Sequence, residues 1–155
     1  MSEEIFGAVQ KLPVNGTKKQ VVLQCAPLLT GIKLSNLLNV RSDQKEEVLR
    51  IFEGSPVCCR VLYEFQGRLS ILLYRPGMLA AYLEREDVKK LMTSFGYENP
   101  DLEETLNRIA DAYQDHMNGK RGFPHEIGLV LGYPPVDVEG FIEKEGRDFL
   151  YSGYW

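Results

Sequence analysis

The chain has 155 residues, of which 44% are hydrophobic and 26% are charged, and its formal net charge is −4 at pH 7. These values are typical of a soluble globular protein, and we expect residues 1–155 to form a single domain. The negative charge provides no basic surface for nucleic acid or an anionic membrane. Residues 1–4 are acidic where a signal peptide is basic, and no apolar run could cross a bilayer, so the sequence predicts a cytoplasmic protein.

The first forty residues predict a helix and a strand before an ambiguous segment. Residues 3–12 have apolar side chains at helical spacing, and we expect a short amphipathic helix there. Residues 20–24 favour a strand, and Cys25 is expected at its end or in the following turn because Pro27 favours extended backbone before it. Residues 33–40 are compatible with either a second strand or a helical turn.

The middle of the chain predicts a β-hairpin that follows a helix. Residues 42–52 indicate a helix with Ser42 as its N-cap. Residues 57–65 and 69–74 are rich in β-branched, aromatic and aliphatic side chains, which favours two strands. Residues 66–68 are short enough to join these strands as a hairpin, which we expect at the centre of the sheet.

The following residues are predicted to be mainly helical. Residues 78–83 start a helical turn, and residues 87–95 form a short helix. The longest helix comes next, capped by Asn99 or Asp101 and ending near Asn118. The complete pattern predicts an α+β fold, in which helices pack on a small antiparallel or mixed sheet built on the hairpin and the C-terminal third is helical.

The stretch FPHEIGLVLGYPPVDVEGFIE, residues 123–143, is the most constrained part of the chain and predicts two short helices. Pro124 suits the first position of the first helix. Gly132 is expected to close that helix, and Pro135 to open the second, which ends at Gly146.

Two glycines one turn apart distinguish the first of these helices. His125, Gly128, Leu129 and Gly132 share a face, where the missing side chains would let a flat ligand or another backbone approach closely. One interpretation is a ligand site formed by His125, Glu126, Gly128 and Gly132. The other is tight helix packing, with His125 as a structural residue hydrogen-bonded within the fold.

Residues 123–143, together with Cys25–Pro27 and Gly31–Lys33 upstream, resemble an uncharacterised bacterial family, a domain of unknown function found mostly in anaerobic Gram-positive bacteria. The resemblance spans most of the chain and brings no established activity, so no catalytic role is carried over from it. Members of the family continue beyond an element similar to Gly153–Trp155, which implies that this chain either lacks a C-terminal extension or is naturally short.

The three cysteines favour reduced thiols over a disulfide or a metal site. Their number is odd, and the chain shows no export signal. Cys58 and Cys59 are adjacent, so on a strand their side chains point to opposite faces and cannot bind one ion together. Cys25, His116 and His125 lack the spacing of zinc ligands, and no metal site is expected.

Cys25 and His125 have the residue types of a nucleophile and its general base, as in a thiol hydrolase. Glu126 is a poor third member of this set, because adjacent residues on a helix point about 100° apart. The alternative is that Cys25 is a buried structural cysteine next to Pro27.

Cationic side chains and terminal aromatic residues suggest two further surfaces. Lys33, Arg60, Arg68 and Arg75 could bind an anion if they cluster, or could belong to a solvated sheet face. The chain has neither a dinucleotide-binding nor a P-loop motif. Four aromatic rings within residues 149–155 favour docking on the domain or on a partner.

From the sequence we expect a cytosolic binding or accessory protein whose partner is a protein or a small molecule. One alternative is a thiol-dependent enzyme that uses Cys25 and His125. The other is a redox or cofactor-handling accessory protein, which is suggested by the hosts of the family. The sequence identifies no cofactor.

Overall fold

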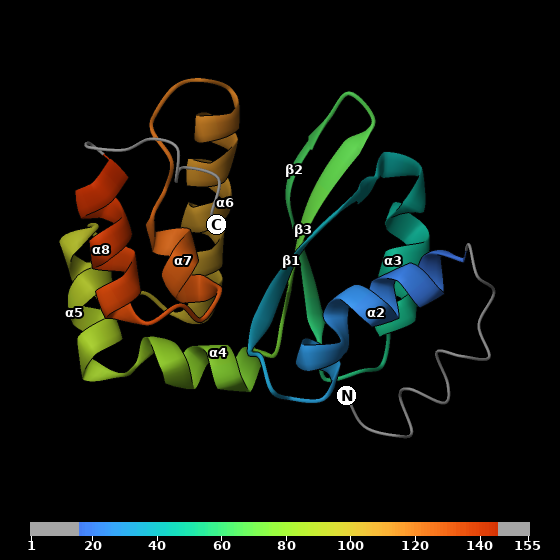
Figure 1. Cartoon of the computed structure of the whole chain (residues 1–155), viewed down its shortest axis with the longest axis horizontal. Coiled ribbons are helices and arrows are strands. Elements are labelled where there is room, and N and C mark those ends of the chain that lie inside the picture. The colour runs from blue at the N-terminus through green and yellow to red at the C-terminus, as the bar shows by residue number, and fades with distance from the viewer. Residues whose placement is uncertain (1–15, 146–155) are drawn as a thin grey trace. The chain divides into compact units, whose positions relative to one another are not determined.

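The computed structural model describes residues 16–145, which form two compact units divided after Pro76 (Figure 1). Unit 1 combines helices with a sheet and unit 2 is helical, so the fold is α+β, as the sequence predicts. The helix expected at residues 3–12, the stop at Gly146 and the aromatic ending at 149–155 lie outside the described residues. The expectation of one domain over the whole chain stays a prediction. Within residues 16–145, no helix combines the length and the apolar character that a membrane span requires.

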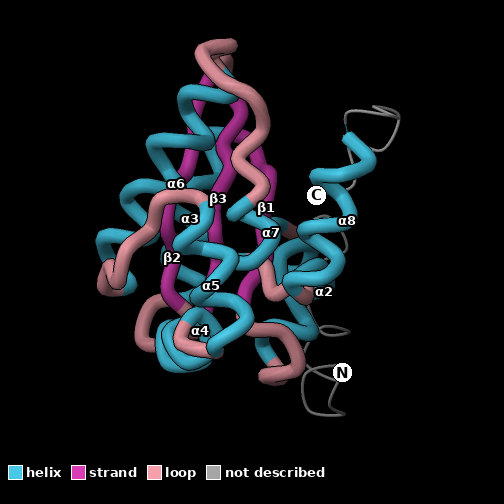
Figure 2. The backbone as a smooth tube through the Cα atoms, turned by 90° about the vertical axis from the view of Figure 1, so that its left-hand side faces the viewer, coloured by secondary structure: helices cyan, strands magenta, loops and turns pink. Residues whose placement is uncertain are grey.

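Unit 1 is built on an antiparallel sheet of three strands in the order β1-β3-β2 (magenta in Figure 2). Its elements in chain order are α2 (Thr17–Leu29), β1 (Ser35–Arg41), the 3-10 helix η1 (Ser42–Gln44), α3 (Lys45–Phe52), β2 (Cys58–Phe65) and β3 (Arg68–Tyr74). The segment that was ambiguous at residues 33–40 is therefore a strand.

The predicted hairpin is confirmed as β2 and β3, joined by Gln66 and Gly67. Both turn residues have positive φ, 49° and 77°, which is the backbone that matches the twist of a two-residue hairpin. Only β3 lies at the centre of the sheet, because β1 pairs with its other edge. The expectation that both hairpin strands are central is thus correct for β3 and wrong for β2.

The strand expected at residues 20–24 is wrong, because these residues belong to helix α2. Val21, Cys25 and Leu28 follow one another at helical spacing, and all three are fully buried. The gain from burying this face outweighs the preference of adjacent valines for extended backbone. Cys25 therefore lies inside a helix and not at a strand end, and α2 accommodates Pro27 in its last turn.

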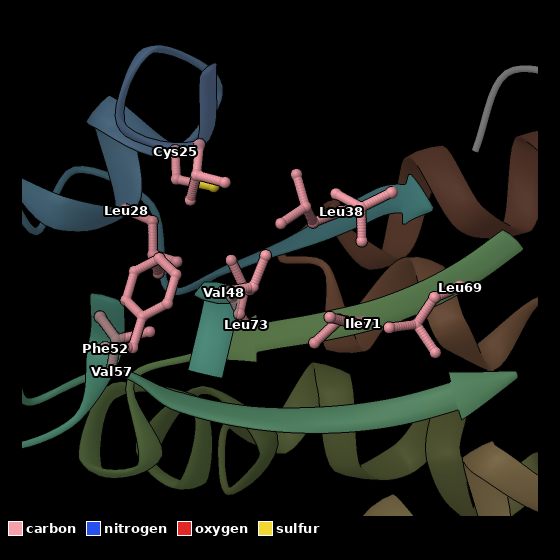
Figure 3. Packing of buried hydrophobic residues seen from close by; sticks show 11 residues of the cluster. Cys25, Leu28, Leu38, Val48, Phe52, Val57, Leu69, Ile71 and Leu73 are labelled. Carbon is pink, nitrogen blue, oxygen red and sulfur yellow. The ribbon is translucent and has the colours of Figure 1, made fainter. Parts of the chain in front are cut away.

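The core of unit 1 lies between α2, α3 and one face of the sheet (Figure 3). Cys25 and Leu28 come from α2, Val48 and Phe52 from α3, and Ile71 from the central strand. The other members of the cluster are Val21, Leu38, Val40, Val57, Leu69 and Leu73. β3 is buried along nearly its whole length, which agrees with its central position in the sheet.

The helix predicted at residues 42–52 starts as a 3-10 turn, and Ser42 is its first residue and not an N-cap. The side chain of Gln44 takes the capping role instead: its Oε1 accepts a hydrogen bond from the Arg41 N–H at 3.0 Å. Its Nε2 donates to Thr17 Oγ1 at 3.1 Å, which ties the turn to the start of α2. The helix therefore starts one residue earlier than the Ser42 cap would place it.

Unit 2 contains α4 (Pro76–Leu83), α5 (Glu86–Ser94), α6 (Leu102–Met117), α7 (Glu126–Val130) and α8 (Pro135–Glu145). The helices predicted in this half of the chain are confirmed. Asp101 caps α6 by accepting a hydrogen bond from the Glu104 N–H at 2.8 Å.

The constrained stretch forms two helices, α7 and α8, as predicted. α7 begins at Glu126, two residues later than the position expected for Pro124. Gly132 closes it with a φ of 88°, and the N–H groups of Gly132 and Tyr133 donate to carbonyls one turn back. Pro135 opens α8, as expected.

Candidate functional site

Cys25 is enclosed in the core of unit 1. Its side chain has no exposed surface, and Asn36 Nδ2 lies 3.4 Å from Sγ. Burial raises the pKa of the Cys25 thiol, and the Asn36 hydrogen bond opposes this only in part. A nucleophilic cysteine needs access and a stabilised thiolate, so these surroundings favour the structural interpretation. His125, the other residue of the predicted pair, belongs to unit 2.

Cys58 and Cys59 point to opposite faces of β2, as the strand geometry predicts. Cys58 is exposed, whereas Cys59 is partly buried and packs against the core of unit 1. Burial raises the pKa of the Cys59 thiol to about 11. Within residues 16–145, no three His, Cys, Asp or Glu side chains are grouped so that they could hold a metal ion.

Among the cations predicted as an anion site, Arg68 and Arg75 lie at opposite ends of β3, and Arg60 lies on the neighbouring strand β2, opposite Leu72. Arg75 is used structurally: its Nε and Nη2 donate to the carbonyls of Leu28 and Leu29, both at 2.8 Å. It thereby binds the C-terminal end of α2, where a positive charge is favourable. Arg68 begins β3 and Arg75 follows its end, so they are about 20 Å apart along the strand. Lys33 is exposed in the connection between α2 and β1.

Gly128 is packed inside unit 2, whereas Gly132 lies just beyond the end of α7 and is half-buried. All five residues of α7 are buried, Gly128 among them. The His125 ring lies between the rings of Phe123 and Phe141, with both centroid distances at 5.5 Å. These contacts favour the packing interpretation for Gly128 and a position for His125 among aromatic side chains.

Glu126 is the predicted binding residue with the most specific surroundings. Its side chain is only 4% exposed, and its Oε2 accepts a hydrogen bond from the Tyr97 hydroxyl at 3.0 Å. Arg121 Nη2 lies 3.9 Å from the other oxygen, Oε1, which is too long for a hydrogen bond. Tyr97 itself is 3% exposed, so the pair is a buried hydroxyl–carboxylate contact between the start of α7 and the α5–α6 connection.

The Tyr97 hydroxyl stays protonated in these surroundings. Burial raises the pKa of Tyr97, and the nearby negative charge of Glu126 raises it further. The Arg108 guanidinium lies over the Tyr97 ring at 4.0 Å from the centroid and donates to the Gly96 carbonyl at 3.0 Å. The tyrosine is therefore a fixed hydrogen-bond donor.

Glu126 lies at the base of a recess in unit 2 with a volume of about 290 Å³, which we call the Glu126 recess. Three carboxylates line it, those of Asp111, Asp115 and Glu126, together with the guanidinium groups of Arg108 and Arg121. The remaining lining residues are Phe95, Tyr97 and Ala112. Neither Asp111 nor Asp115 makes a side-chain hydrogen bond or ion pair to another described residue.

Sequence reasoning identified Glu126 but missed its partners. Tyr97 and Arg121 lie in connections between helices, where hydrophobic periodicity does not predict which way a side chain points. A weak signal existed for α6, because Arg108, Asp111 and Asp115 are spaced three and four residues apart and share one face of the helix.

Comparison with known proteins identifies a family for the chain. The family model described as "Protein of unknown function (DUF3793)" matches residues 21–155. No curated protein and no solved structure matches the chain.

Proposed function

The chain belongs to the DUF3793 family, whose function is unknown, and we propose from its geometry that it is a binding or accessory protein whose ligand occupies the Glu126 recess. The ligand is small and carries a cationic nitrogen, as in a primary amine or a guanidine. The observation that carries the proposal is the buried Glu126 carboxylate, of which one oxygen is hydrogen-bonded and the other is not.

A buried carboxylate is stable only when hydrogen bonds or a positive charge replace water. Among the described residues, the Tyr97 hydroxyl is the one hydrogen-bond donor to the Glu126 side chain. Arg121 is close enough to attract Oε1 but not to bond it, and its own side chain is 44% exposed. A ligand N–H group at Oε1 would complete the site, and Arg121 has room to move aside.

The charges that line the recess select for a cation. Arg108 is held by the Tyr97 ring and the Gly96 carbonyl, so its charge is already engaged. Asp111 and Asp115 add two carboxylates near Glu126. A cationic group would therefore meet more negative than positive charge, whereas an anion would be repelled.

A binding role is better supported than the thiol-enzyme alternative. That alternative requires the Cys25 thiol to reach a substrate, but the side chain is fully buried in the core of unit 1, where its polar neighbour is the Asn36 amide. No observation favours the redox or cofactor-handling alternative. We also propose a cytoplasmic location in an anaerobic Gram-positive bacterium, supported by the sequence resemblance and by the odd number of cysteines.

Calorimetric titration with methylguanidine and n-butylamine tests the proposal, with methylurea as the uncharged analogue. We expect at least one cation to bind and methylurea not to bind. Glu126→Gln should abolish binding, because it removes the charge and keeps the shape. Glu104→Gln, which makes the same charge change at an exposed position of α6, is the control. Equal binding of methylurea and methylguanidine, or unchanged binding by Glu126→Gln, would refute the site.

A further inference from the structure

A second concave site in unit 2, between α4, α5 and the start of α6, shares Tyr97 with the Glu126 recess as a lining residue. We call it the α4–α5 cavity, and its volume is about 80 Å³. Its apolar walls include Leu83, Met92, Leu102 and the Tyr97 ring. Ala80 on α4 also lines it, and the small size of this side chain leaves the space open.

Charged residues at the rim of the cavity are already engaged. Glu84 and Lys89 pair with each other at 3.5 Å. The Asp101 carboxylate caps α6, and the Thr105 hydroxyl donates to the Asp101 carbonyl at 2.9 Å. Asp101 keeps its negative charge, but a charged group placed against the apolar walls of the cavity would lose its hydration without a counter-charge inside it.

One polar rim residue is available to a ligand. Asn99 lines the cavity and is exposed, and its side-chain amide makes no hydrogen bond within the described part of the chain. An amide can both donate and accept. Next to an apolar cavity it offers a hydrogen-bonding position for a neutral polar group.

From these features we propose that the α4–α5 cavity binds an uncharged small molecule with a short aliphatic end and one neutral hydrogen-bonding group, such as an amide. The cavity volume is about half of the roughly 150 Å³ that accommodates benzene in an engineered apolar cavity. An aliphatic end of roughly three to four carbon atoms fits this space, and the polar group reaches Asn99. This site is separate from the Glu126 recess and does not depend on the proposed function.

Three probes that share one branched five-carbon skeleton but differ in charge test the proposal: isovaleramide, isovalerate and isoamylamine. The methyl group of Met92, which is 5% exposed, reports directly on the cavity in a methyl NMR spectrum. The exposed Met78 and Met117 are internal controls. Isovaleramide should shift the Met92 signal with a dissociation constant on the order of 1 mM, while the two control signals stay in place.

Filling the cavity should remove binding. Ala80→Leu should weaken isovaleramide binding at least about ten-fold, because the new side chain occupies the aliphatic subsite. Ala81→Leu adds the same group at an exposed position of α4 and should leave binding unchanged. If Ala80→Leu does not fold, the smaller Ala80→Val serves the same purpose.

Each outcome decides a part of the proposal. A Met92 signal that none of the probes shifts, or binding that survives Ala80→Leu, overturns the site. Binding of isovalerate or isoamylamine as tight as that of isovaleramide overturns the preference for an uncharged ligand. Glu126→Gln should leave isovaleramide binding intact, so the failure of one site can be distinguished from the failure of the other.

Discussion

Removal of the Tyr97 hydroxyl tests the buried contact on which the Glu126 recess depends. Tyr97→Phe keeps the ring under Arg108 but leaves Glu126 Oε2 without its donor. Because hydrogen bonds to charged groups contribute about 1.5–3 kcal/mol, the variant should lose that amount of unfolding free energy. Both side chains are nearly fully buried, and the loss is smaller where a water molecule in the recess takes the place of the hydroxyl.

Tyr82→Phe provides a matched comparison. The Tyr82 hydroxyl donates to the Tyr133 carbonyl at 2.9 Å, and this acceptor is neutral. Its loss should cost about 0.5–1.5 kcal/mol, the usual range for neutral pairs. Urea denaturation followed by circular dichroism at pH 7 measures both variants. If Tyr97→Phe costs no more than Tyr82→Phe, the reasoning about a charged acceptor is refuted.

The pH dependence of protein stability provides an independent test of the Tyr97–Glu126 contact. The pKa of Tyr97 is raised in the folded protein, so the folded state holds this proton more tightly than the unfolded chain, whose tyrosines titrate near pH 10. The contribution is fully present below about pH 10 and is lost as the pH rises further. The stability difference between the parent and Tyr97→Phe should therefore be constant from pH 7 to about 9 and shrink above about pH 10.

Two further predictions concern α7 and the thiols. Gly128→Leu should lower the free energy of unfolding by about 1–3 kcal/mol because Gly128 is buried. Gly140→Leu on α8, where a Cβ would meet no atom within 4 Å, should instead raise it by a few tenths of a kcal/mol or more through helix propensity. Melting temperatures compare the two variants, and equal stability would show an open α7 face. With a thiol reagent at pH 8, the exposed Cys58 should react rapidly, and Cys59 should react slowly because its pKa of about 11 leaves little thiolate. The buried Cys25 should react only after the protein is unfolded. A total below three thiols in unfolded protein without reductant would indicate a disulfide.

The parts of the fold that the sequence predicts correctly are those set by neighbouring residues. The β2–β3 hairpin depends on Gln66 and Gly67 and on two apolar runs beside them. α6 depends on its Asp101 cap and its apolar stripe. In both cases local backbone preference and burial favour the same structure, so periodicity alone is sufficient.

The predictions are wrong or incomplete where contacts between residues distant in the sequence determine the structure. Residues 20–24 prefer extended backbone locally, but packing of Val21 and Leu28 in the core of unit 1 makes them helical. The partners of Glu126 were missed for the same reason, because Tyr97 is 29 residues away along the chain. No local pattern relates two such positions, although the sequence singles out Glu126 itself as a candidate binding residue.

The arrangement of the sheet also bears on the order in which unit 1 assembles. β2 and β3 are joined by a two-residue turn and can pair within about 1–10 μs, as isolated hairpins do. β1 must instead find β3 across the whole of α3 and β2, since Ser35 pairs with Tyr74 and Arg41 with Arg68. Closing this longer loop costs more chain entropy before any contact compensates for it. Both edge strands pair with β3 in the folded sheet, but we expect β2 to pair earlier during folding than β1. The docking of β1 is the step expected to limit the folding rate.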